Sequence, residues 1–111
     1  MKPIAKVIVG IIAFSGVVGV ATCTRIVSRY AQAFETTNNG EPVAMIISRF
    51  GAPSVREVPA HPFLTYAAAG CKAPCSVRLW WEHPVLKGIE AWSVDIDNKN
   101  QVIHKAHWVS P

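Results

Sequence analysis

The sequence predicts an α+β fold, in which an N-terminal hydrophobic helix precedes one or two short helices packed on a three- to four-stranded antiparallel meander. Three observations indicate this fold class. An uncharged apolar run fills most of the first 23 residues, apolar side chains then recur at helical spacing as far as Phe50, and beyond Pro53 they alternate with polar ones. We therefore divide the 111 residues into a leader, residues 1–23, and one small domain, residues 24–111.

Residues 1–23 have the composition of an export leader. Lys2 and Lys6 precede an apolar run with small residues at its end, where a signal peptidase cleaves. Cleavage after Ala21 is one fate. In a second, Val-Ala-Thr-Cys resembles a lipobox and Cys23 carries a lipid, although Thr stands where Gly, Ala or Ser is usual. In a third, the leader stays in the bilayer as an anchor, since its length reaches the lower limit of about 17–25 residues.

Cys71 and Cys75 flank a turn-forming stretch. If Cys23 is lipidated, they remain as an even pair, and we expect a disulfide, which persists only in an oxidising compartment. A redox-active dithiol is the alternative, but such sites normally have two intervening residues at a helix N-terminus. Here three residues intervene and a strand follows. The pair therefore indicates export more than thiol chemistry, and zinc lacks two further ligands at suitable spacing.

Two segments have helical periodicity. Residues 25–34 predict a short amphipathic helix, which either continues the leader helix or lies near the membrane surface. Turn-forming residues follow at 36–40. Residues 42–50 predict a second helix, which begins with proline in its favoured first-turn position. Gly51 ends this helix and Pro53 prevents it from restarting.

The rest of the domain has the period of a strand. Four segments are expected as strands: residues 63–68, 76–82, 90–96 and 102–109. Residues 97–100 join the last two as a hairpin turn, and residues 84–88 join the middle two. The segment from Gly51 to Pro62 is typical of a connecting loop. These strands predict an antiparallel meander with the short helices on one face.

The segment that reads GEPVAMIISRFGAP contains the second predicted helix. Gly40 opens this helix, which carries Val43 or Ile46. Gly51 and Pro53 then close it before the predicted sheet. This arrangement resembles the signature of the SmpA/OmlA (BamE-like) family of small envelope lipoproteins. The resemblance implies an exported leader, short helices and a strand meander in that order, and a role in assisting the assembly of outer-membrane barrels.

The charged residues and histidines predict no reactive site. The net charge is +4, but the basic residues are scattered and form no one-sided stripe, which argues against nucleic-acid binding. His104 and His107 lie three apart on an expected strand, so they point to opposite faces and cannot share a metal. No phosphate-binding glycine loop or serine elbow is present. We therefore expect a protein that is not an enzyme, with no cofactor and no metal.

Trp80 and Trp81 are adjacent on one predicted strand, so they must face opposite sides of the sheet. We expect Trp81 in the core beneath the helices. Trp80 then lies either under another covering element or in solvent. In the second case Arg78 and Glu82 flank it on the same face, and such a composition is favoured at interface hot spots. Trp80, Arg78 and Glu82 are therefore candidate partner-binding residues.

The leading hypothesis is a membrane-anchored, non-enzymatic protein of the bacterial cell envelope, acting as an interaction or assembly module on the periplasmic side. A lipid on Cys23 would place it at the outer membrane, and a retained leader at the inner membrane. A second hypothesis is a single-pass accessory subunit of an inner-membrane complex, with residues 4–22 packed against other helices. A third is a thiol-dependent enzyme that uses Cys71 and Cys75.

Overall fold

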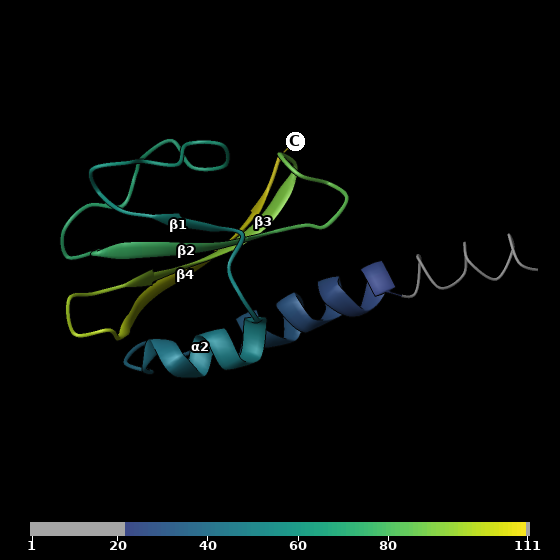
Figure 1. Ribbon diagram of the computed structural model, residues 1–111, viewed down its shortest axis with the longest axis horizontal. Coiled ribbons are helices and arrows are strands. Elements are labelled where there is room, and N and C mark those ends of the chain that lie inside the picture. The colour runs from purple at the N-terminus through teal and green to yellow at the C-terminus, as the bar shows by residue number, and fades with distance from the viewer. Residues whose placement is uncertain (1–21, 111) are drawn as a thin grey trace, which may run out of the picture.

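Four antiparallel strands form the centre of the protein (Figure 1). The computed structural model describes residues 22–110, so the predictions for the leader before residue 22 lie outside the described residues. The strands follow the chain in the order β1-β2-β3-β4. Their bounds are Val55–Glu57 for β1, Val77–Glu82 for β2, Glu90–Ile96 for β3 and Val102–Val109 for β4. The predicted α+β class and antiparallel meander are confirmed for this part of the chain.

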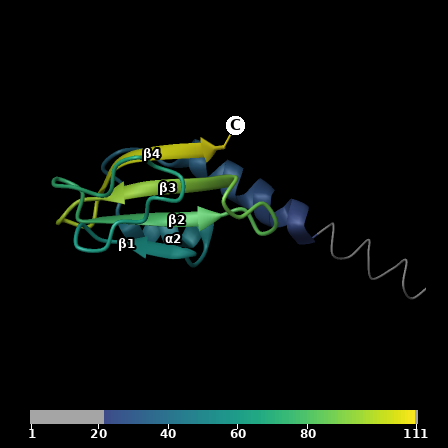
Figure 2. The same cartoon turned by 90° about the horizontal axis from the view of Figure 1, so that it is seen from above.

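Two helices cover one face of the sheet (Figures 1 and 2). The first is described over residues 22–36 and includes the amphipathic segment expected there. The second, α2, spans Val43–Phe50, within one residue of the expected helix. It ends at Gly51, whose φ of 91° lies in the left-handed region that favours glycine. The Gly51 N–H donates to the Ile47 carbonyl oxygen at 2.8 Å and so completes the last turn.

Trp81 lies at the centre of the core between the sheet and the helices, as expected. Its side chain is fully buried, and Phe50 of α2 stacks on it with ring centroids 4.1 Å apart. Its Nε1–H donates to the Gly51 carbonyl oxygen at 3.0 Å. On the neighbouring strand, Trp92 packs against Tyr30 of the first helix, with centroids 5.4 Å apart. Aromatic contacts thus fix both helices on this face.

An irregular segment, residues 59–76, covers the opposite face of the sheet, and we call it the lid. The strand expected at residues 63–68 is wrong, because these residues form bends and loops without a partner strand among the described residues. Phe63 and Tyr66 pack on Trp80, and a spacing of three residues does not match the period of two that a strand requires. The apolar residues of the lid therefore serve a second small core.

β1 lies between Gly51 and Pro62, where the sequence predicts a connecting loop. Its three residues pair with β2, with Val55 opposite Trp80 and Glu57 opposite Arg78. This pairing makes β2 and β3 the two central strands of the sheet. The central strands are accordingly buried almost throughout. β4, at the other edge, is buried only at Val102, and its other residues are exposed or partly buried.

The chain before α2 pairs with the first residue of β4. The Gly40 N–H donates to the Val102 carbonyl oxygen at 2.7 Å, and the Val102 N–H donates to the Glu41 carbonyl oxygen at 2.9 Å. Pro42 and Gln101 form an isolated antiparallel bridge at the same place. The outer edge of β4 is therefore occupied at its start by residues 40–42.

Candidate functional site

Trp80 lies beneath the lid and not in solvent. Its side chain is 0% exposed, and its ring centroid lies 5.4 Å from those of both Phe63 and Tyr66. Of the two positions expected for Trp80, beneath a covering element or in solvent, the first is therefore confirmed. The lid segment occupies the face on which a partner would have to lie to contact Trp80, and the Trp80 side chain belongs to the second small core.

Arg78, the second candidate contact residue, connects the sheet to the lid. Its Nε–H donates to Asp95 Oδ1 at 2.7 Å, and its Nη1 lies 3.7 Å from Glu57 Oε1. The same Nη1 donates to the carbonyl oxygen of Ala69 in the lid at 3.0 Å. A guanidinium held by two carboxylates and a carbonyl has few donors left for a partner. The structure thus gives Arg78 a role in holding the lid.

Glu57 is the central acceptor under the lid, and no pattern in the sequence indicates this role. Its carboxylate is fully buried on β1. Oε2 accepts the backbone N–H of Cys71 at 2.7 Å, and Oε1 accepts the Nε1–H of Trp80 at 2.8 Å. A buried carboxylate is tolerated only when its oxygens are hydrogen-bonded and a cation lies near, as Arg78 does here. One acidic side chain therefore links the sheet, the lid and the arginine.

Glu82, the third candidate contact residue, anchors the other part of the lid. Its Oε2 accepts the Tyr66 hydroxyl at 2.7 Å, and the hydroxyl oxygen accepts the Gly88 N–H at 2.7 Å. Burial raises the pKa of Tyr66, and the hydrogen bond to Glu82 raises it further. The hydroxyl therefore stays protonated and keeps its donor role throughout the neutral range. The three residues proposed as a binding surface all hold the lid on the sheet.

Cys71 and Cys75 form a disulfide within the lid, with Cα atoms 5.5 Å apart. Both side chains are buried, whereas reactive thiols normally lie in partly exposed, electropositive surroundings. Cys23 lies in the helix of residues 22–36, is partly exposed and is not disulfide-bonded. Among residues 22–110, no helix combines the length and the apolar character needed to cross a membrane.

Comparison with known proteins assigns this chain to no family. No protein-family model matches it, and neither does any curated protein or solved structure. The resemblance to the SmpA/OmlA lipoproteins therefore stays a prediction from residues 40–53.

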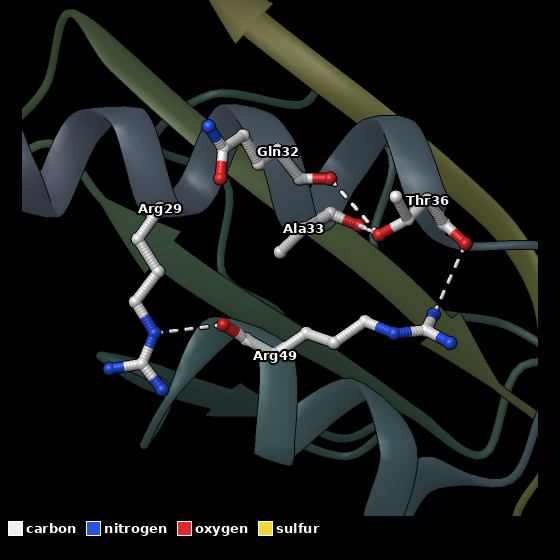
Figure 3. Close-up of a pocket in the computed structure, with 5 residues that line it drawn as sticks. All are labelled: Arg29, Gln32, Ala33, Thr36 and Arg49. Atoms are coloured by element: carbon white, nitrogen blue, oxygen red, sulfur yellow. Dashed lines mark hydrogen bonds between the residues drawn. The ribbon is translucent and has the colours of Figure 1, made fainter.

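An open pocket lies between the two helices, lined by Arg29, Gln32, Ala33, Thr36 and Arg49 (Figure 3). Its two arginines are used in the fold. Arg29 donates from Nε to the Arg49 carbonyl oxygen at 2.8 Å, at the end of α2. Arg49 donates from Nη1 to the Thr36 carbonyl oxygen at 3.1 Å, at the end of the first helix. Each arginine thus satisfies carbonyl groups that a helix C-terminus leaves without partners.

Arg49 also binds Glu41 through both of its terminal nitrogens, at 2.8 Å and 2.6 Å. The hydrogen bond from Arg49 and a second from the Asn38 N–H lower the pKa of Glu41 to about 2. This pair joins the turn between the helices to the last turn of α2. The pocket is therefore a helix-to-helix junction, in which Arg49 is paired with Glu41 and Arg29 donates to backbone carbonyl groups.

The Glu41 pair predicts a loss of stability in acid. Because the pKa of Glu41 is lower in the folded protein than its ordinary value of 4.5, its contribution is complete above pH 4.5 and is lost as the pH falls towards about 2. We expect Glu41→Gln to reduce the urea midpoint at pH 7 and to have little effect near pH 2. Glu35→Gln, at an exposed carboxylate on the first helix, is the control. Equal curves for Glu41→Gln and wild type at pH 7 would contradict the role of the pair.

Glu90 lies between two histidines at one end of the sheet. His107 Nε2 lies 2.9 Å from Glu90 Oε2, and His83 Nε2 lies 3.9 Å from Glu90 Oε1. His107 also stacks on Trp92, with centroids 4.9 Å apart and an interplanar angle of 10°. Among the described residues no group of three or more His, Cys, Asp and Glu side chains is placed to hold a metal ion. These contacts order the end of the sheet next to the loop between β2 and β3.

β4 forms one edge of the sheet, opposite β1 (Figure 2). The Ser110 N–H donates to the Ile89 carbonyl oxygen at 2.7 Å. Because antiparallel pairs alternate in whether they exchange hydrogen bonds, the even-numbered residues from 104 onward bond to β3. Lys105, His107 and Val109 therefore direct their backbone N–H and C=O groups away from the sheet. This outer edge is the candidate binding site that remains once the sheet faces are covered.

Proposed function

We propose that the chain is a membrane-anchored envelope protein that acts without catalysis, as a module that binds a protein partner on the periplasmic side. The leader supplies the anchor, either as a lipid on Cys23 or as a retained helix. The Cys71–Cys75 disulfide supports an oxidising location, since such bonds are rare in the bacterial cytoplasm. The partner meets the domain at the outer edge of β4.

The observation that carries this proposal is the coverage of the sheet. Two helices lie on one face and the lid lies on the other, so neither face can receive a partner without unfolding. The β4 edge is occupied by residues 40–42 only at its first residue. An extended segment of another protein can add to such an edge through backbone hydrogen bonds.

The position of the Lys105 side chain is also consistent with a partner at the outer edge of β4. Lysines on edge strands often project outward and prevent unwanted pairing. Here Lys105 Nζ donates to the Phe34 carbonyl oxygen at 2.6 Å and lies 4.5 Å from the Phe34 ring centroid. The first helix thus holds this ammonium group away from the outer edge. The backbone of the strand stays accessible to a partner strand.

Substitution of His107 by proline or alanine tests the edge. His107→Pro removes an N–H that points outward and that the sheet does not use, whereas His107→Ala removes the same side chain but keeps this N–H. With the full chain extracted in mild detergent, native electrophoresis is expected to show a complex larger than the chain for wild type and His107→Ala. His107→Pro is expected to lose that complex while keeping its far-UV circular dichroism. Identical migration of the two variants would contradict the edge as the binding site.

The mass of the chain purified from membranes tests the anchor. An acylated N-terminal Cys23 indicates a lipoprotein, and an intact Met1 indicates a retained helix. The second result would favour a single-pass accessory subunit of an inner-membrane complex. A chain that begins at residue 22 and is recovered in the soluble fraction would overturn the anchor.

A further inference from the structure

Exposed apolar side chains gather at one end of the domain. Three of them belong to the loop between β2 and β3: Val85 is 70% exposed, Leu86 42% and Ile89 46%. The fourth, Val109, is 63% exposed at the end of β4 and lies opposite Glu90, the residue after Ile89. We call these four residues the apolar tip. They account for most of the exposed large apolar side chains among the described residues.

Hydrogen bonds hold the loop of the apolar tip in place. His83 Nδ1 accepts the N–H groups of Val85 and Leu86 at 3.1 Å and 2.9 Å. The Leu86 carbonyl oxygen accepts the N–H groups of Ile89 and Glu90 at 3.0 Å and 3.1 Å. An ordered loop that holds apolar side chains in water forgoes roughly 25 cal/mol for each Å² left unburied. Such an arrangement is typical of a surface that becomes buried against something else.

The apolar tip lies at the end of the molecule where the leader joins. In both Figure 1 and Figure 2, the loop between β2 and β3, the end of β4 and the start of the first helix all lie towards the same end of the long axis. Residues 22 and 23, the first described residues of that helix, are the last two residues of the leader. A leader held in a membrane therefore places this end of the domain nearest the bilayer.

The charges at this end suit a lipid surface. Lys87 lies within the loop and Arg25 lies near the start of the first helix, and both are exposed. The two acids that flank the loop both have hydrogen-bond partners: Glu90 Oε2 lies 2.9 Å from His107 Nε2, and Glu82 Oε2 accepts the Tyr66 hydroxyl. Exposed cations beside apolar side chains favour the interface of a bilayer that contains anionic lipids.

We propose that the apolar tip inserts into the interfacial region of a lipid bilayer, so that the domain is held to the membrane at two points. This inference rests on the proposed function, because the leader must first hold the chain at the membrane. Two attachment points fix the tilt of the domain. The outer edge of β4 then stands at a fixed angle to the membrane, which presents it to a partner in a single orientation.

Site-specific photo-crosslinking tests the contact. The full chain, carrying p-benzoylphenylalanine at Val85, is purified from membranes and reconstituted in vesicles of phosphatidylcholine and phosphatidylglycerol. We expect lipid adducts after irradiation, measured by mass spectrometry. The matched control places the same probe at Leu64, which is 55% exposed on the lid, and no lipid adduct is expected there. Leu86→Asp is expected to reduce the adducts at Val85 by at least about tenfold, since a bilayer strongly excludes a carboxylate.

Flotation of the same vesicles separates two kinds of failure. If the chain floats with the vesicles but the Val85 probe yields no lipid adduct, the tip contact is overturned and the anchor stands. Protein adducts at Val85 in place of lipid adducts likewise overturn it. If the chain does not float, the anchor fails, and the proposed function fails with it. Equal lipid adducts at Val85 and Leu64 would show non-specific contact and would also overturn the inference.

Discussion

Replacing Glu57 by leucine is expected to lower the free energy of unfolding by about 3–5 kcal/mol, the usual cost of removing one partner from a buried charged pair. The carboxylate accepts two hydrogen bonds, from the Cys71 N–H at 2.7 Å and from Trp80 Nε1–H at 2.8 Å. Each donor left unpaired in the interior costs about 1–3 kcal/mol. Arg78 keeps its bond to Asp95, so its own charge stays partly compensated.

Urea denaturation followed by far-UV circular dichroism measures this loss. Glu57→Gln is the matched variant, since it keeps the shape and one acceptor oxygen, and we expect it to cost less than Glu57→Leu. The leucine variant should also make the Cys71–Cys75 disulfide easier to reduce, because the lid loses its bond to Cys71. A leucine variant within about 1 kcal/mol of wild type would show that the buried network contributes little.

The regular elements were largely predictable from the sequence. Residues 90–96 and 102–109 form β3 and β4 with the bounds expected, because apolar and polar residues alternate on both sides of a clear turn. α2 was predictable from its apolar stripe and from Gly51. The face of Trp81 followed from the same alternation. These signals are local, so each helix or strand could be predicted from its own segment of the sequence.

The lid and its network were not predictable, because they depend on contacts between distant residues. Glu57 stands in a short proline-rich stretch, and nothing near it in the sequence shows that it meets Trp80 and Cys71. Alternation placed Trp80 on the other side of the sheet from Trp81 but could not show whether that side was covered. The apolar residues of 63–68 have the composition of a strand, although they pack on Trp80 from an irregular segment. The hydrogen bonds that Arg29 and Arg49 make between the two helices were likewise not predictable, because they form only when both helices are in place.

Trp80→Ala is expected to lower the free energy of unfolding by about 3–5 kcal/mol, the range for removing a large aromatic side chain from a core. The cavity would lie where the ring now meets Phe63, Tyr66 and Trp108, whose ring centroids are 5.4, 5.4 and 5.9 Å away. Since a small domain has a total stability of only about 5–15 kcal/mol, this variant is expected to lose the lid and much of its cooperativity.

Trp80→Phe separates a structural role from a contact role. The phenyl ring fills much of the space under the lid but cannot donate to Glu57, so we expect a loss of about 1.5–3 kcal/mol, the worth of a hydrogen bond to a charged group. Far-UV circular dichroism during urea unfolding measures this loss without depending on tryptophan emission. Because Trp80 is 0% exposed, the folded variant should keep the partner complex that His107→Pro loses. A Trp80→Phe protein as stable as wild type that nevertheless loses the complex would return Trp80 to the binding surface and remove the lid from its structural role.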